Sequence, residues 1–169
     1  VHRSSMVSEE IFNLEQMHVF DRSWVYLGHE SEIPQNGSFI RRRVASRPMF
    51  FVRGNDGKPR AFLNTCRHRG AMVCRQEQGS ATVFQCFYHG WSYDNKGNLI
   101  GIPDEAAYSP AFEKSEFGLI QPPLMDEYRG FYFVCFNREA QSLNSYLGDA
   151  KIFIDIVVDQ KEGGIRVLP

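Results

Sequence analysis

Two short segments carry the same pair of metal-binding residue types, and their spacing limits what the chain can fold into. One residue separates Cys66 from His68, two separate Cys86 from His89, and seventeen lie between the two pairs. Each segment therefore offers one thiolate and one imidazole, a mixture that suits iron in a sulfide-bridged pair. We expect two loops that bind one metal centre from opposite sides, with all four residues as its ligands.

The ligand set predicts a [2Fe–2S] cluster of the Rieske type, in which one iron takes the two cysteines and the other the two histidines. Two ferric ions, two sulfides, two thiolates and two neutral imidazoles sum to zero charge, whereas an all-cysteine site is anionic before reduction. Replacing two thiolates by imidazoles therefore raises the reduction potential to roughly −150 to +300 mV. Each imidazole also keeps a second nitrogen that is free to contact a partner, so His68 and His89 are expected to pass single electrons.

A structural zinc site is the alternative, because zinc also accepts two cysteines and two histidines. Zinc fingers usually pair cysteine with cysteine and histidine with histidine along the sequence, unlike the mixed pairs here. Gly70 and Gly90 closely follow the histidines and allow backbone N–H groups to approach cluster sulfurs. Tyr88 and Trp91 are expected to pack over the cluster and keep water out.

Composition indicates a globular protein of one ordinary domain, with 169 residues, 43% of them hydrophobic. The net charge of −1 gives no reason to expect nucleic acid or an anionic membrane as a partner. No apolar run reaches the length of a membrane span, and the first residues do not resemble a signal peptide. Two cysteines beside histidines favour metal binding in a reducing, cytoplasmic compartment, and Cys74 and Cys135 are expected to be small buried residues.

Residue patterns predict an all-β fold, mainly antiparallel, with a small two-loop cluster-binding subdomain. A helix is expected over 8–20, with Ile11, Leu14 and Met17 on its buried side, and a short one over 142–147. Turns at 55–57 and 95–97 predict two hairpins, and the prolines between 102 and 128 a long excursion. Strands are expected at 24–27, 39–45, 49–53, 61–64, 91–94, 98–100, 129–136, 152–158 and 165–168.

Residues 61–70 and 86–91 resemble the N-terminal Rieske domain of Rieske non-heme iron ring-hydroxylating oxygenase α subunits. The similarity extends to residues 22–29 and 129–134. It implies electrons from an NAD(P)H-dependent reductase, often through a ferredoxin, and a mononuclear Fe(II) in a catalytic domain that oxygenates an aromatic or related substrate. It also implies a homotrimer, with or without a β subunit, in which His89 meets a carboxylate of the neighbouring catalytic domain.

One departure from that family concerns the mononuclear iron, which needs two histidines and a carboxylate. No histidine follows His89, and His2, His18 and His29 do not fall in an iron-binding motif of the family; His29 is expected in a turn. We therefore expect residues 1–148 to form the Rieske domain and 149–169 the start of a catalytic domain that is otherwise absent. Such a chain has no catalytic residues of its own and should not turn over substrate alone.

Two other Rieske classes are weighed against this interpretation. A stand-alone Rieske ferredoxin is shorter and lacks both the leading helix and the long excursion. The respiratory class carries an additional cysteine in each loop and a membrane anchor, and has a serine where this chain has Trp91. Arg67 and Arg69 flank His68 and could dock an acidic ferredoxin or reductase. Arg41–Arg43 could do the same, although an alternating strand with a solvated face is the simpler interpretation for them.

Overall fold

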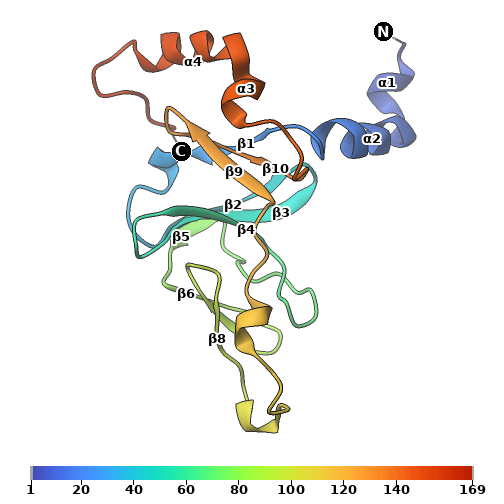
Figure 1. The fold of residues 1–169 in the computed structure, drawn as a ribbon, viewed down its shortest axis with the longest axis vertical. Helices are drawn as coiled ribbons and strands as arrows, with labels where there is room; N and C mark the ends of the chain where they lie inside the picture. The colour runs from blue at the N-terminus through green and yellow to red at the C-terminus, as the bar shows by residue number, and fades with distance from the viewer. Residues whose placement is uncertain (1, 169) are drawn as a thin grey trace. The chain divides into compact units, whose positions relative to one another are not determined.

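A computed structural model describes residues 2–168 and divides them into two compact units (Figure 1). Unit 1 contains residues up to 29, 44–46 and those from 122 onward, and unit 2 contains 30–43 and 47–121. The chain thus leaves unit 1 and returns to it. The domain boundary predicted between residues 148 and 149 does not coincide with the limits of these two units. It remains a prediction.

Unit 1 is built on one antiparallel sheet with the strand order β1-β10-β9. Its strands are β1 (Val25–His29), β9 (Leu124–Tyr128) and β10 (Phe131–Cys135). Trp24, Cys135 and Leu143 form its buried cluster, and the Trp24 indole N–H donates to the Gln141 carbonyl at 2.8 Å. The predicted helix at 142–147 is confirmed as α3 (Leu143–Leu147), followed by the 3-10 turn η5 (Gly148–Ala150).

The predicted N-terminal helix is present, but its apolar side is not buried. After the turn α1 (Ser4–Val7), Ser8 caps α2 (Glu9–Glu15) by accepting from the Ile11 N–H at 3.4 Å. The chain continues as the π-helix η1 (Gln16–Phe20). Leu14 and Met17 are 45% and 52% exposed, so the prediction of a buried stripe is wrong for them.

The two strands predicted near the C-terminal end are also wrong. Residues 152–158 lie in the helix α4 (Lys151–Val158), and 165–168 have no regular secondary structure. The β-branched run favours a strand intrinsically, but contacts within unit 1 fix a helix. Asp155 accepts from the Tyr128 hydroxyl at 2.9 Å, and Arg129 forms ion pairs with Asp155 and Asp159, which are four positions apart on one helix face.

Unit 2 contains two antiparallel sheets over an aromatic core, and the predicted all-β class is confirmed. The larger sheet has the order β4-β3-β2-β5, and the smaller has the order β6-β7-β8. Phe50 packs against Phe62 and Phe84 at ring-centroid distances of 5.4 and 4.7 Å. The strands are β2 (Ser38–Val44), β3 (Arg47–Arg53), β4 (Pro59–Leu63), β5 (Gln78–Ser80), β6 (Val83–Gln85), β7 (Ser92–Asp94) and β8 (Leu99–Gly101).

Both predicted hairpin turns are present and are joined to each other. The turn at 55–57 connects β3 to β4, and that at 95–97 connects β7 to β8. The buried Asn95 amide donates to the Asn55 side chain at 2.8 Å, and its oxygen accepts from the Asn55 N–H at 3.2 Å. This reciprocal pair ties the small sheet to the large one, which matters because the candidate ligands come from both.

The segment after β8 is a long excursion, as predicted, but it ends earlier than expected. It contains the 3-10 turns η3 (Glu105–Ala107) and η4 (Lys114–Phe117), and residues 124–128 are already strand β9. Another 3-10 turn, η2 (Glu30–Glu32), follows β1. Among the helices of residues 2–168, none combines the length and the apolarity that a membrane crossing needs.

Candidate metal centre

The two candidate ligand loops have the same backbone geometry. The Cys66 N–H donates to the Ala71 carbonyl at 2.8 Å, and the Gly70 N–H donates back to the Cys66 carbonyl at 3.0 Å. The second loop repeats both bonds, from Cys86 to the Trp91 carbonyl at 2.8 Å and from Gly90 to Cys86 at 2.9 Å. Both glycines have positive φ, +75° and +73°, a conformation that explains why glycine stands at these two positions.

These matched loops separate the thiols from the imidazoles. Cys66 and Cys86 are 3% and 2% exposed and belong to the core of unit 2, whereas His68 is exposed and His89 half-buried. The two imidazole rings meet edge to face with their centroids 4.6 Å apart. The structure thus places the four residues as two pairs, with the thiol pair inside and the imidazole pair at the surface. That all four bind one metal centre remains a prediction.

The environment of Cys86 disfavours a free thiolate. Burial raises the pKa of its thiol, and the contact with Cys66 raises it further, against the lowering effect of the Tyr88 and His89 N–H groups. A bound metal would supply the positive charge that a thiolate needs there. No three of the His, Cys, Asp and Glu side chains among residues 2–168 converge closely enough to hold one metal ion. A donor set split into two pairs fits two irons better than a single zinc ion.

Tyr93 is a member of this site that the sequence interpretation missed. Its fully buried hydroxyl lies 3.3 Å from the Cys66 Sγ and accepts from the Arg67 N–H at 3.1 Å. A sulfur that binds iron as a thiolate has no proton of its own, so in the cluster-bound protein the Tyr93 hydroxyl would be the donor of this contact. Burial and the contact with Cys66 raise the Tyr93 pKa, which keeps the hydroxyl protonated as a donor. The sequence does contain a signal for this role. Tyr93 lies two positions after Trp91, so the two side chains share one face of the strand that follows the second loop.

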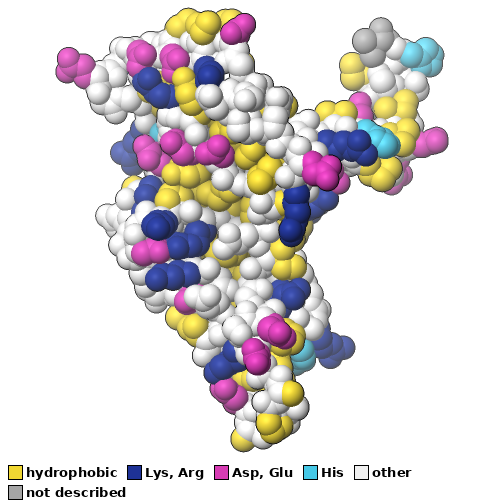
Figure 2. All heavy atoms as spheres, in the orientation of Figure 1, with side chains coloured by type: hydrophobic (Ala, Val, Ile, Leu, Met, Phe, Trp, Pro, Cys, Tyr) yellow, Lys and Arg dark blue, Asp and Glu magenta, His cyan; other side chains and the backbone are white. Residues whose placement is uncertain are grey.

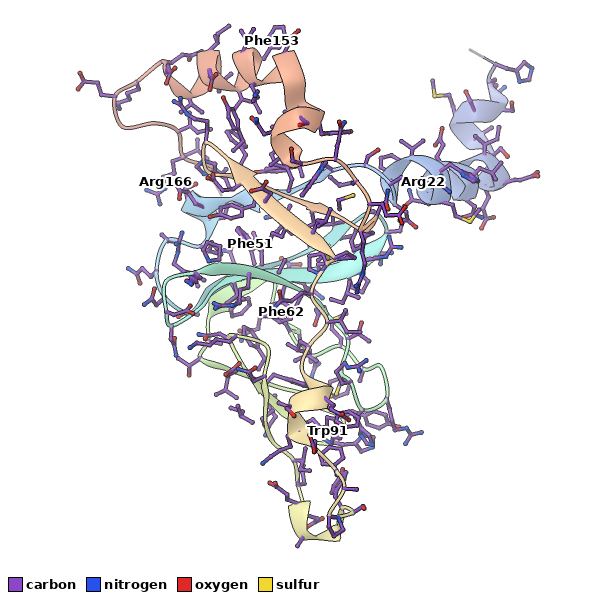
Figure 3. All side chains as sticks on the ribbon, viewed as in Figure 1. Arg22, Phe51, Phe62, Trp91, Phe153 and Arg166 are labelled. Carbon is purple, nitrogen blue, oxygen red and sulfur yellow. The ribbon has the colours of Figure 1, made fainter. Side chains whose placement is uncertain are left out.

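Trp91 backs His68 on the inner side of the loops. The indole is 2% exposed and lies nearly parallel to the His68 ring, with centroids 5.0 Å apart and 10° between the planes. Phe117, from η4, packs edge-on against Trp91 at 5.8 Å, and the indole N–H donates to the Tyr108 hydroxyl at 3.4 Å. Figure 3 shows the labelled Trp91 beside the turn η4. The long excursion therefore holds the tryptophan in place.

Tyr88 occupies a different position from the one expected. It stacks on His89 with ring centroids 3.9 Å apart, but 51% of it is exposed. Shielding of the site from water therefore rests on Trp91. Tyr88 instead forms part of the surface beside the half-buried histidine.

Asn64 is a second residue that the sequence interpretation missed, and it fixes the end of the first loop. Its buried side chain accepts from the Val73 and Cys74 N–H groups at 3.1 and 2.7 Å and donates to the Cys74 carbonyl at 2.7 Å. These three bonds replace the ladder hydrogen bonds that an irregular buried segment lacks. They hold the backbone of residues 73 and 74, which follow the first loop, against Asn64 at the end of β4.

The remaining cysteines and histidines lie outside this group. Cys74 and Cys135 are buried, as predicted, and all four cysteines are unpaired; burial raises the Cys74 pKa to about 11. His29 is a correction, because it lies buried in β1 with its ring edge against Phe131 at 4.9 Å and not in a turn. His2 is exposed and bonds to Ser4, and His18 lies in η1.

Comparison with known proteins identifies the fold around these loops. The Rieske [2Fe-2S] domain matches residues 23–122, more than half of the chain. The chain belongs to the Rieske [2Fe-2S] domain family. Its cofactor is therefore a [2Fe–2S] cluster, and the matched range includes both loops.

Proteins similar to this chain include α subunits of dioxygenases. The biphenyl 2,3-dioxygenase subunit alpha of Rhodococcus jostii (strain RHA1) is 38% identical over 161 residues, which are 95% of this chain and 35% of the relative. The benzene 1,2-dioxygenase subunit alpha of Pseudomonas putida is 39% identical, with 95% and 36% covered. The chain therefore spans just over a third of the length of these relatives.

Solved structures of oxygenases are also similar to this chain. The naphthalene 1,2-dioxygenase from Rhodococcus sp. bound to indole superposes with a TM-score of 0.94 at 38% identity, covering 100% of this chain and 39% of that one. The apo form of the quaternary ammonium Rieske monooxygenase CntA gives a TM-score of 0.81 at 27% identity, covering 92% and 45%. These likenesses favour an oxygenase component over a stand-alone ferredoxin.

Proposed function

We propose that Cys66 and Cys86 bind one iron of the [2Fe–2S] cluster and that His68 and His89 bind the other. The observation that carries this assignment is the pair of matched loops, which bring two buried thiols together and leave two imidazoles 4.6 Å apart at the surface. When bound there, the cluster accepts and releases one electron at a time. The imidazoles connect it with the surface, and the buried side is closed by Trp91 and Tyr93.

The protein's role, in our proposal, is one-electron transfer within a ring-hydroxylating oxygenase. An NAD(P)H-dependent reductase or a ferredoxin would supply the electron, and a mononuclear non-heme iron in a catalytic domain would receive it. The support is the similarity to dioxygenase α subunits, which are 38% and 39% identical to this chain over 95% of its length. We expect an aromatic compound as substrate of the complete enzyme, and a homotrimer, with or without a β subunit, as its assembly. The four unpaired thiols support the predicted cytoplasmic location.

The chain as printed is proposed to transfer electrons without oxygenating substrate itself. A mononuclear iron site of the oxygenase type uses two histidines and a carboxylate, and no histidine follows His89. Residues 149–169 are proposed to begin the catalytic domain of such an enzyme. The catalytic residues of the reaction would then lie outside these 169 positions.

Removing single ligands tests the cluster assignment. Cys66→Ala and His89→Ala are expected to abolish the visible absorption and the EPR signal of the reduced cluster, because each removes one of four iron ligands. Cys74→Ala is the matched control, since Cys74 is as buried as Cys66, at 3% exposed, but is not a proposed ligand. Retention of an unchanged Rieske EPR signal after either ligand substitution, or its loss in Cys74→Ala alone, would refute the assignment.

A further inference from the structure

The long excursion that follows β8 is attached to the rest of unit 2 near both of its ends. Pro103 lies against the second ligand loop, because a β-carbon on Gly90 would come 3.0 Å from the Pro103 Cγ atom. Further along the chain, the Leu119 N–H donates to the Gly97 carbonyl at 2.7 Å. We call residues 103–119 the strap, which is drawn in yellow to orange low in Figure 1.

Two aromatic side chains of the strap pack on the buried Trp91. Phe112 and Phe117 lie nearly perpendicular to the indole, at ring-centroid distances of 6.0 and 5.8 Å and interplanar angles of 75° and 83°. They also stack on each other at 4.6 Å. Aromatic pairs of this geometry contribute stability beyond the area that they bury. In a close-packed interior the indole therefore cannot tilt unless these two rings move with it.

The stack between Trp91 and His68 passes this constraint to the imidazole. The two ring planes are 10° apart and their centroids 5.0 Å apart, so a rotation of the imidazole about its own χ2 angle would break the stack. The χ2 torsion of a histidine is broad by itself. His68 is exposed, and solvent on its outer side leaves the ring plane free. The plane of this ring is therefore limited from the inner side, by Trp91.

The two proposed ligand histidines are supported in different ways. His68 rests on an indole that is 2% exposed, whereas His89 stacks at 3.9 Å on Tyr88, which is 51% exposed. Figure 2 shows a histidine side chain at the surface in the lower part of the molecule. A buried side chain is fixed by its close-packed neighbours, but exposed side chains change rotamer within picoseconds to nanoseconds. Only His68 is thus supported by a rigid neighbour.

We propose that the strap sets the orientation of the His68 imidazole through Trp91, and that Phe112 and Phe117 are positioning residues for this proposed iron ligand. The inference rests on the proposed cluster ligands and deepens that function. The plane of an imidazole decides how it overlaps with the iron that it binds, and contacts that orient a ligating histidine tune the metal. A fixed plane also means that this ligand rearranges little when the cluster gains or loses an electron.

Pulsed EPR of the reduced, cluster-loaded chain tests the role of the strap. Each iron-bound imidazole contributes its own nitrogen hyperfine coupling, and the size of that coupling depends on the orientation of the ring. Phe117→Ala is expected to shift and broaden one of the two couplings and to leave the other at its wild-type value, because the indole and the imidazole stacked on it gain freedom. Phe112→Ala is expected to change the same coupling. Strap residues are substituted in place of Trp91, since removal of the buried indole would open a cavity beside the ligand loops.

Two comparison variants show whether the effect is specific. Tyr88→Ala removes the support of His89 and is expected to shift the coupling that Phe117→Ala leaves unchanged. Phe39→Leu perturbs the same core, where Phe39 packs on Phe84 at 5.3 Å, and is expected to leave both couplings at their wild-type values. Wild-type couplings in both strap variants, or an equal change in Phe39→Leu, would overturn the role of the strap.

The outcomes also separate this inference from the function on which it rests. A reduced wild-type cluster without two nitrogen couplings would refute the proposed ligands, and the role of the strap with them. Two wild-type couplings that neither strap variant changes would overturn the role of the strap alone. If Phe117→Ala and Tyr88→Ala shifted the same coupling, the two histidines would not be supported separately, and the inference would be wrong.

Discussion

The Tyr93 hydroxyl lies beside the Cys66 sulfur and is hydrogen-bonded to the Arg67 backbone N–H. Its oxygen accepts from that N–H and lies 3.3 Å from the Sγ atom. When that sulfur is an iron-bound thiolate it has no proton, so the hydroxyl is the donor between the two. A hydrogen bond to a cluster sulfur stabilises the form with more negative charge, which is the reduced one. Tyr93 is therefore expected to raise the reduction potential of the cluster.

Tyr93→Phe is expected to lower that potential by about 20–60 mV, because a hydrogen bond contributes about 0.5–1.5 kcal/mol and one electron converts 1.4 kcal/mol to about 59 mV. Protein-film voltammetry of the cluster-loaded chain measures the change. Tyr108→Phe is the control, since the Tyr108 hydroxyl contacts Trp91 and no cysteine. An unchanged or higher potential in Tyr93→Phe would show that the hydroxyl does not donate to the sulfur.

At the scale of elements, the β7–β8 turn packs directly on strand β4, which leads into the first ligand loop. Gly97 has φ +89°, and a β-carbon there would lie 2.3 Å from Cε1 of Phe62. Gly57, in the β3–β4 turn, has a similar φ of +77°, but its β-carbon would meet only an Asn36 oxygen at 3.9 Å. The two turns therefore share a backbone requirement and differ in crowding.

Gly97→Ala is expected to destabilise the chain more than Gly57→Ala does. Both variants place alanine at positive φ, but only Gly97→Ala also forces the Phe62 ring to move, at an additional cost of about 1–3 kcal/mol. Thermal unfolding at fixed pH measures the difference, because about 1 kcal/mol lowers Tm by a few degrees in a chain of this length. Equal Tm values for the two variants would contradict the close packing of Gly97 on Phe62.

Elements with a strong local signal were predictable, and those fixed by distant contacts were not. Glycine-containing turns at 55–57 and 95–97 and the alternating strands around them follow from the sequence. The β2–β3 turn does not, because Ala45 and Ser46 adopt positive φ without being glycine. Helix α4 depends on Tyr128 and Arg129, some thirty positions earlier. Likewise, the four candidate ligands are evident from spacing, whereas Tyr93 enters the site only through folding.

At the scale of the whole molecule, the two cysteines proposed as ligands belong to the core of unit 2. Cys66 and Cys86 lie in the aromatic core of unit 2, whereas unit 1 is centred on Trp24, Cys135 and Leu143. Metal binding is coupled to folding where the ligands are part of the core. Loss of the cluster should therefore affect the two units unequally.

Removing iron and sulfide is expected to increase amide hydrogen exchange most strongly over residues 64–93, which include both loops and β7. Amides of β1, β9 and β10 are expected to keep most of their protection, because their sheet contains no candidate ligand. Hydrogen exchange with mass spectrometry on the cluster-loaded and cluster-free chains makes the comparison. Equal loss of protection in both units would show that they unfold together.

The central claim is that this chain carries a Rieske cluster, and EPR of the reduced protein tests it most directly. Iron and acid-labile sulfide are quantified on the same sample. We predict a rhombic signal of the Rieske type with about two iron and about two sulfide per chain. Bound zinc without sulfide and without this signal would contradict the account, because the two matched loops would then hold a structural ion and could not carry an electron.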